Sequence, residues 1–144
     1  MDDIVWSINP RNDTMESLFL RIKTFAAKLF EAKEINYKID IDENIKHLHV
    51  KMENRQDIYL ILKEAINNLV KYSESTKAEI NVGFDFGELC ILIKDNGIGF
   101  DTEKFSLGNG LNSMKKRAEG MNASLKIHSE LEEGTTINLS VKIK

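Results

Sequence analysis

The order of the patterned segments constrains this fold most, because the helical segments are grouped between pairs of strands and do not alternate strictly with them. Apolar residues recur at helical spacing over residues 13–33 and again over about 55–72, and a third helix is predicted over about 111–121. Strand patterns cover residues 37–41, 47–52, 78–85, 88–94, 124–129 and 135–143. This order favours an α+β two-layer sandwich over a doubly wound parallel sheet.

The ends of the predicted elements carry local signals. Asp13 and Glu16 are placed as a capping box at the start of the first helix. Phe86-Gly87 separates two strand patterns and predicts a hairpin between them. The apolar start of the chain stops at Pro10, the only proline, and resembles the tail of a helix.

Composition limits the class of protein. A chain of 144 residues, 42% hydrophobic and 30% charged, fits one compact domain with a real core. The net charge of −3 gives no global reason to bind nucleic acid or an anionic membrane, and no apolar run approaches the roughly 20 residues that span a bilayer. The single Cys90 excludes an internal disulfide framework, predicts a packing role within its apolar strand, and favours a reducing, cytoplasmic compartment.

A carboxylate and two glycines, in Asp95-Asn96-Gly97-Ile98-Gly99-Phe100, directly follow the apolar strand at 88–94. A buried carboxylate at a strand end can accept a hydrogen bond from an exocyclic amine such as that of adenine. Glycines allow the backbone to approach a flat ring without Cβ clashes. Taken alone, Asp-Asn-Gly is also an ordinary turn signal, so both interpretations stay open at this point.

The second predicted helix has one apolar face and one polar face. On the polar face, Glu64, Asn68 and Lys71 follow at i, i+4 and i+7 and offer a carboxylate, an amide oxygen and an ammonium to one space. These are groups that a magnesium nucleotide needs, although a solvated surface face is the ordinary alternative.

A second glycine cluster, Gly108-Asn109-Gly110-Leu111, precedes the third predicted helix. Backbone N–H groups at the start of a helix form an anion site, and Lys115, Lys116 and Arg117 add positive charge in the next turns. A flexible loop and a solvated basic face are the alternatives.

Taken in order, these motifs resemble the ATP-binding catalytic domain of sensor histidine kinases, in the GHKL superfamily with gyrase, Hsp90 and MutL. The segment from Glu64 to Ser73 resembles the N box, the Asp95 segment the G1 box, and the Gly108 segment the G2 box. Gly134-Thr135 resembles the terminal Gly-Thr of the family. The seven residues 101–107 between the second and third boxes suggest a short lid like that of the kinases related to nitrate and desaturase sensors. Tyr72 departs from that group, in which a histidine is often found at this position.

The resemblance implies a Bergerat fold, in which three helices cover one face of a mixed, mostly antiparallel sheet. It implies that ATP and Mg²⁺ are the cofactors, with Asn68 as the magnesium ligand and Glu64 as the catalytic residue that polarises the incoming histidine. Asp95 would receive the adenine amino group. The other implied ATP-binding residues are Lys71, Tyr72, Gly97, Ile98, Gly99, Gly108, Gly110, Leu111 and Thr135.

The resemblance also implies partners that the motifs do not contain. A sensor kinase phosphorylates a helical histidine, whereas His47, His49 and His128 all fall on predicted strands and are interpreted as structural or surface residues. The acceptor is therefore expected on a dimerisation domain of the same parent protein, with a response regulator as the next partner. Residues 1–12 are interpreted as the end of a truncated dimerisation helix or linker, and residues 13–144 as the catalytic domain.

The resemblance predicts a cytoplasmic fragment, which could be the cytoplasmic part of a membrane-bound sensor. It also predicts that the fragment alone does not autophosphorylate. Alternatives are a non-catalytic nucleotide-binding or interaction module, a GHKL ATPase of the gyrase or MutL kind, an anti-sigma serine kinase, and a domain for an apolar ligand or peptide.

Overall fold

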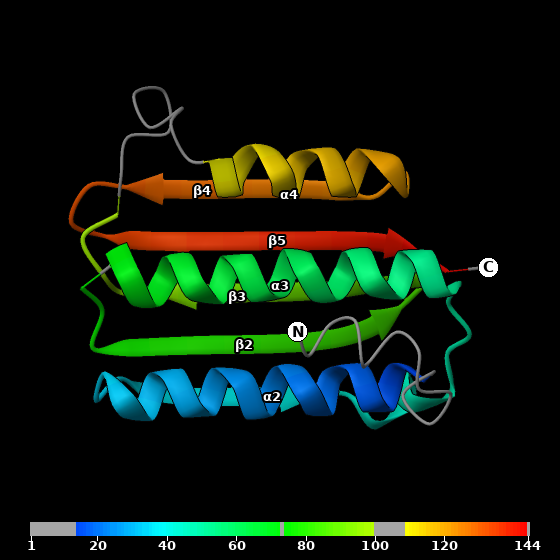
Figure 1. Ribbon diagram of the computed structural model, residues 1–144, viewed down its shortest axis with the longest axis horizontal. Coiled ribbons are helices and arrows are strands. Elements are labelled where there is room, and N and C mark those ends of the chain that lie inside the picture. The colour runs from blue at the N-terminus through cyan, green and yellow to red at the C-terminus, as the bar shows by residue number, and fades with distance from the viewer. Residues whose placement is uncertain (1–13, 73, 100–108, 144) are drawn as a thin grey trace.

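In its described residues, the protein forms two layers, a five-stranded sheet and three α-helices that cover one of its faces (Figure 1). The computed structural model describes residues 14–72, 74–99 and 109–143. The helices are α2 (Met15–Ala32), α3 (Met52–Tyr72) and α4 (Asn109–Gly120), and the strands are β1 (Asn36–Ile41), β2 (Lys77–Asp85), β3 (Glu88–Asp95), β4 (Ser124–Glu130) and β5 (Gly134–Lys142). The predicted α+β sandwich is confirmed.

The sheet has the strand order β1-β2-β3-β5-β4 and is mixed. Only the β1–β2 pair is parallel, and the other three pairs are antiparallel, including the predicted hairpin of β2 and β3. Side chains alternate between the two faces of the sheet, as the period of a strand requires. On the covered face the register places Ile80, Ile93, Ile137 and Ile127 in one continuous row across four strands.

The helices bury one face each against this row and its neighbours. On α3 the predicted apolar positions are buried: Ile58, Ile61, Leu62, Ala65, Ile66 and Leu69. The same helix leaves Glu64 and Asn68 half-buried and Lys71 exposed on its other side. The two-sided pattern of this helix is therefore confirmed, and the helix begins at Met52, earlier than predicted.

The first helix begins one residue later than the predicted capping box implies. Thr14 is its N-cap, and the Thr14 hydroxyl accepts a hydrogen bond from the Ser17 backbone N–H at 3.0 Å. The prediction of Asp13 and Glu16 as a capping box was wrong, because a threonine one position further along satisfies the same helix end. Asp13 itself lies outside the described residues, as does all of the segment 1–12, whose interpretation stays a prediction.

The strand predicted at residues 47–52 is absent. A short 3-10 helix, η2 (Glu43–His47), precedes a few extended residues, and α3 starts at Met52. Asp42 caps η2 by accepting a hydrogen bond from the Asn44 backbone N–H at 3.0 Å, which commits this segment to a turn. Of the three histidines, only His128 lies on a strand.

Cys90 faces away from the helices. Leu89 and Ile91 take the buried positions of β3, so Cys90 lies on the exposed face, with its Sγ 3.8 Å from the Ser140 hydroxyl. The predicted packing role was wrong, because an apolar run says nothing about which of its alternate positions is covered. Within the described ranges, no helix combines the length and the apolarity that crossing a membrane requires.

Candidate functional site

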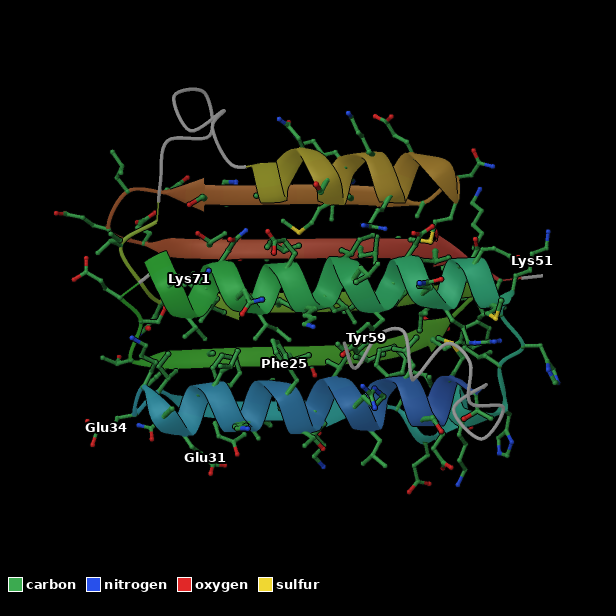
Figure 2. The ribbon with its side chains drawn as sticks, viewed as in Figure 1. Phe25, Glu31, Glu34, Lys51, Tyr59 and Lys71 are labelled. Atoms are coloured by element: carbon green, nitrogen blue, oxygen red, sulfur yellow. The ribbon has the colours of Figure 1, made fainter. Side chains whose placement is uncertain are left out.

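Four segments that carry predicted site residues meet at one end of the molecule. The C-terminal ends of α3 and β3, the N-terminal end of α4 and the turn between β4 and β5 all lie at the left of Figure 1. Lys71 marks the end of α3 in Figure 2. The fold therefore brings together motifs that lie far apart in the sequence.

Asp95 is the last residue of β3 and continues the buried face of that strand, so its carboxylate points toward the helix layer. Its exposed fraction is 6%, which is unusual for a carboxyl side chain. Burial raises the pKa of Asp95, and hydrogen bonds from the Gly97 N–H, the Ser75 hydroxyl and the Thr135 N–H lower it. The Gly97 bond is 2.8 Å long. The protein thus surrounds a buried carboxylate with donors from three different segments.

Asn96 fastens the turn that follows Asp95. Its side-chain oxygen accepts hydrogen bonds from the Thr76 and Lys77 backbone N–H groups at 3.0 and 2.9 Å, and its amide nitrogen donates to the Thr76 hydroxyl at 3.0 Å. Asn96 therefore has the structural role expected of a turn residue. Asp95 differs, because its side chain points into the protein. Together, Asn96 and Ser75 tie the Asp95 turn to the connection between α3 and β2.

The turn between β4 and β5 packs directly on the Asp95 turn. Gly134 has φ +101°, and a Cβ on it would overlap the Asp95 carbonyl oxygen. Gly99 has φ +64°, and a Cβ there would overlap the Glu130 carbonyl oxygen. A backbone hydrogen bond from the Glu132 N–H to the Ile98 oxygen joins the same two turns. These glycines are needed at a backbone contact between two turns, which side chains would push apart.

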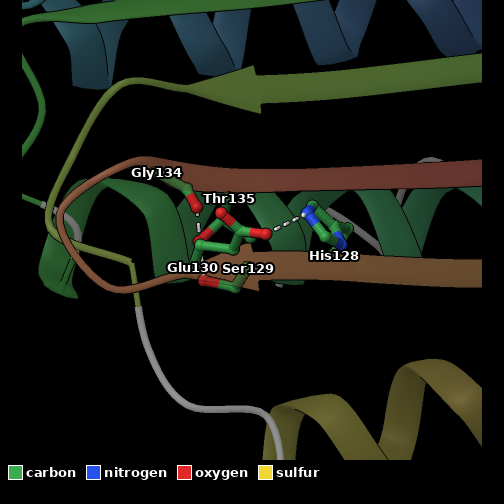
Figure 3. A network of polar contacts seen from close by, with 5 residues as sticks. All are labelled: His128, Ser129, Glu130, Gly134 and Thr135. Atoms are coloured by element: carbon green, nitrogen blue, oxygen red, sulfur yellow. Dashed lines mark hydrogen bonds and ion pairs between the residues drawn. The ribbon is translucent and has the colours of Figure 1, made fainter.

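Thr135 contributes its backbone N–H to Asp95 and its side chain to the sheet. Its hydroxyl lies 2.8 Å from the Ser129 hydroxyl, and the Ser129 hydroxyl also donates to the Gly134 oxygen at 3.3 Å (Figure 3). On either side of Ser129 in β4, His128 Nε2 is 3.4 Å from Glu130 Oε1. The contacts of Ser129 with Gly134 and Thr135 join β4 to the start of β5, where Thr135 reaches Asp95.

The remaining predicted residues are placed only in part. Gly97 is buried, Gly99 is half-buried, and Ile98 is 44% exposed. Gly108 and the side chains of Tyr72 and Leu111 lie outside the described residues. Gly110 and Leu111 belong to the first turn of α4, which begins two residues earlier than predicted.

Arg117 does not add charge at the start of α4. Its guanidinium lies 3.2 Å from Asp57, which is in the N-terminal part of α3. The pair joins α4 to α3 away from the Asp95 turn, while Lys115 and Lys116 are exposed. The sequence did not predict three sets of contacts, because each depends on how separate elements pack. They are the contact of Ser75 with Asp95, the hydrogen bonds of Asn96, and the Asp57–Arg117 pair.

Comparison with solved structures agrees with the α+β fold of this chain. The histidine kinase domain of a blue-light activated kinase from Erythrobacter litoralis superposes with a TM-score of 0.74 at 17% identity, over 88% of this chain and 65% of that one. The catalytic domain of the histidine kinase ThkA gives a TM-score of 0.72 at 12% identity, over 90% of this chain and 94% of that one.

A family model described as "Histidine kinase-, DNA gyrase B-, and HSP90-like ATPase" matches residues 53–144. The chain belongs to this family. The oxygen sensor histidine kinase NreB of Staphylococcus carnosus is 27% identical over 118 residues, which are 79% of this chain and 34% of NreB. The chain thus spans about a third of the length of this relative.

Proposed function

We propose that this chain is the ATP-binding catalytic module of a two-component sensor histidine kinase, which positions Mg-ATP so that its γ-phosphoryl group reaches a histidine outside this chain. Membership of the family supports the ATP-binding part of this proposal. The similarity to NreB favours the kinase over the other activities of the family.

The environment of Asp95 carries the proposal. A carboxylate offers about four acceptor positions, and donors from Gly97, Ser75 and Thr135 occupy part of that capacity. These donors hold the carboxylate in one orientation and favour its ionised form, which leaves it able to accept one further hydrogen bond. The exocyclic amine of adenine is such a donor, whereas the carbonyl at the same ring position of guanine would be repelled.

The polar face of α3 would hold the phosphates. Asn68 is half-buried on this face and provides an amide oxygen, a hard ligand that suits Mg²⁺. Because Mg²⁺ is commonly held by one or two protein ligands together with substrate phosphates and water, one protein ligand on this face would suffice. When bound, Mg²⁺ would neutralise charge that develops on the transferred phosphoryl group.

The other predicted site residues would contact the phosphates, polarise the histidine or shape the adenine pocket. The exposed Lys71 is long and flexible enough to face phosphate oxygens, and Glu64, one turn before Asn68, would polarise the incoming histidine. Tyr72, Gly108, Gly110 and Leu111 would complete the adenine and lid side, with Gly97, Ile98 and Gly99 shaping the pocket. The partners would be the histidine-bearing dimerisation domain and a response regulator.

Calorimetry with ATP and magnesium tests the adenine assignment. Asp95→Asn replaces one acceptor oxygen with a donor, so we expect the affinity for ATP to fall at least tenfold. Asp85→Asn removes the same charge from an exposed position at the opposite end of the hairpin and should leave affinity unchanged. Equal affinities for wild type and Asp95→Asn would refute the assignment.

The family description also includes ATPases, so hydrolysis separates the two activities. We expect the chain alone to bind ATP and release phosphate slowly, and to transfer phosphoryl to histidine only in a longer protein that carries the acceptor. Fast steady-state hydrolysis by the chain alone, unchanged when the acceptor domain is added, would favour the ATPase and contradict the kinase.

A further inference from the structure

A cavity lies at the opposite end of α3 from Asp95. Its volume is about 280 Å³, and it is formed where the start of α2, the segment between η2 and α3, and the first turn of α3 meet. Figure 2 labels Lys51 beside this end and Lys71 at the other end of α3. Because α3 has 21 residues, about 30 Å separates the two ends.

Basic side chains line this cavity. Lys46, His47, His49 and Arg55 contribute to its wall, and among its described lining residues none carries a carboxylate. The nearby acidic residues Glu43 and Glu53 are exposed and are not part of the lining. We refer to this site as the basic cavity.

Arg55 forms the buried part of the wall. Its exposed fraction is 8%, and its Nη1 donates a hydrogen bond to the Val50 carbonyl oxygen at 2.5 Å, which fixes the guanidinium in place. Burial lowers the pKa of Arg55, but a guanidinium stays charged at any physiological pH. A fixed positive charge in a region of low dielectric attracts anions more strongly than the same charge on the surface.

The local fold explains why the other basic groups gather here. Leu48 is half-buried and Val50 is buried in the residues that follow η2, while His47, the last residue of η2, and His49 are exposed. Lys46 precedes His47 within η2. The N-terminal end of α3 adds the positive end of its dipole to this group.

We propose that the basic cavity binds an oxyanion of the phosphate class, as a free ion or as a phosphoryl group on another molecule. Its volume is at the lower limit of ordinary ligand sites, which suits a small tetrahedral anion with some of its water. Lys46, His47 and His49 would contact the anion at the rim, and Arg55 would supply charge from below. This site is separate from the proposed nucleotide site and does not depend on it.

A sulfate titration of the full chain followed by amide chemical shifts in NMR tests the proposal. We expect saturable shifts for residues 46–50 and around Arg55, and none at the Asp95 turn. Shifts confined to the Asp95 turn and the end of α3, or no saturable shifts at all, would overturn the proposal.

Variants at the rim separate a specific site from general charge. Lys46→Gln and His49→Gln should each weaken sulfate binding about three- to fivefold, as expected for polar contacts from exposed side chains. Lys126→Gln removes one positive charge from the exposed face of β4 and should change nothing. An equal loss in Lys126→Gln would refute the site, and because Arg55 is buried, the rim variants provide the clearer test.

Two further measurements define the ligand and keep the two sites apart. Tighter binding of a phosphoserine peptide than of inorganic phosphate would assign the anion to a modified protein, and equal or weaker binding would assign it to the free ion. ATP affinity measured in the same variants should equal that of wild type. Absence of ATP binding in wild-type protein that shows the sulfate shifts would count against the proposed function alone.

Discussion

Replacement of Gly134 by alanine should be among the most damaging small changes to this protein. Its φ of +101° is a conformation that nearly only glycine adopts, which costs an alanine roughly 1–3 kcal/mol. The new Cβ would also lie less than 3.0 Å from the Asp95 oxygen, 3.0 Å from the Asp95 carbonyl carbon and 3.1 Å from the Asn96 Cα. All three are backbone atoms that no side-chain rotation can move, which adds roughly 1–3 kcal/mol.

Two other glycines separate these contributions. Gly87 has φ +76° but only one atom near its Cβ position, the Ile143 oxygen at 3.9 Å, so Gly87→Ala should cost about 1–2 kcal/mol through backbone strain alone. Gly83, inside β2, has neither a positive φ nor an atom within 4 Å, so Gly83→Ala should be neutral or stabilise by up to about 1 kcal/mol.

Urea unfolding of the three variants measures this series. With a slope of about 2 kcal/mol per molar urea, Gly134→Ala should lower the midpoint by about 1–3 M, clearly more than Gly87→Ala. Gly134→Ala should also weaken ATP binding at temperatures where it stays folded, because the clash falls on the backbone of Asp95. Equal midpoints for Gly134→Ala and Gly87→Ala would refute the close packing of the two turns.

Three further predictions concern single groups. Glu64→Ala should leave ATP affinity near normal and abolish phosphotransfer in a protein that carries the acceptor histidine, with Glu53→Ala as an exposed control; loss of ATP binding would make Glu64 structural. The Asp57–Arg117 pair is 29% and 41% exposed at its side chains, so a double-mutant cycle in urea should give a coupling energy no greater than about 1 kcal/mol, and a larger value would show a stronger link between α3 and α4. Burial raises the pKa of Asp95 in the folded state, so the folded protein binds a proton at this carboxylate more readily than the unfolded chain does. The free energy of unfolding of wild type relative to Asp95→Asn should therefore increase as the pH falls from 7 toward 4. An opposite slope in urea titrations would contradict the raised pKa.

The sequence predicted the layers of this fold well because their periodicity is strong. The burial of one face of α3 and the alternation along β3 and β5 follow directly from residue spacing. It failed at residues 47–52, where Leu48 and Val50 alternate with polar residues as in a strand. No neighbouring strand pairs with this stretch in the described structure, and the Asp42 cap and an early start of α3 determine its conformation.

The motifs indicated which residues gather at the site, but not what supports them. Asp95 could be singled out because two glycines follow it directly after an apolar strand, and because three other motifs occur in the order of the family. Nothing in the local sequence around Ser75 predicts that its hydroxyl reaches Asp95, since that contact depends on how α3 leads into β2. The close approach at Gly134 depends in the same way on two turns from different hairpins.

The surroundings of Asp95 show how one position can oppose stability and serve binding. Burial disfavours the ionised carboxylate, and the donors from Gly97, Ser75 and Thr135 offset only part of that cost, since the net effect is a raised pKa. A neutral residue would relieve the penalty in the protein without nucleotide, but it would lose the charged acceptor that an adenine amine would use. A bound ligand that donates to the carboxylate would repay the remaining cost, so we expect ATP to stabilise wild type against urea and to stabilise Asp95→Asn much less.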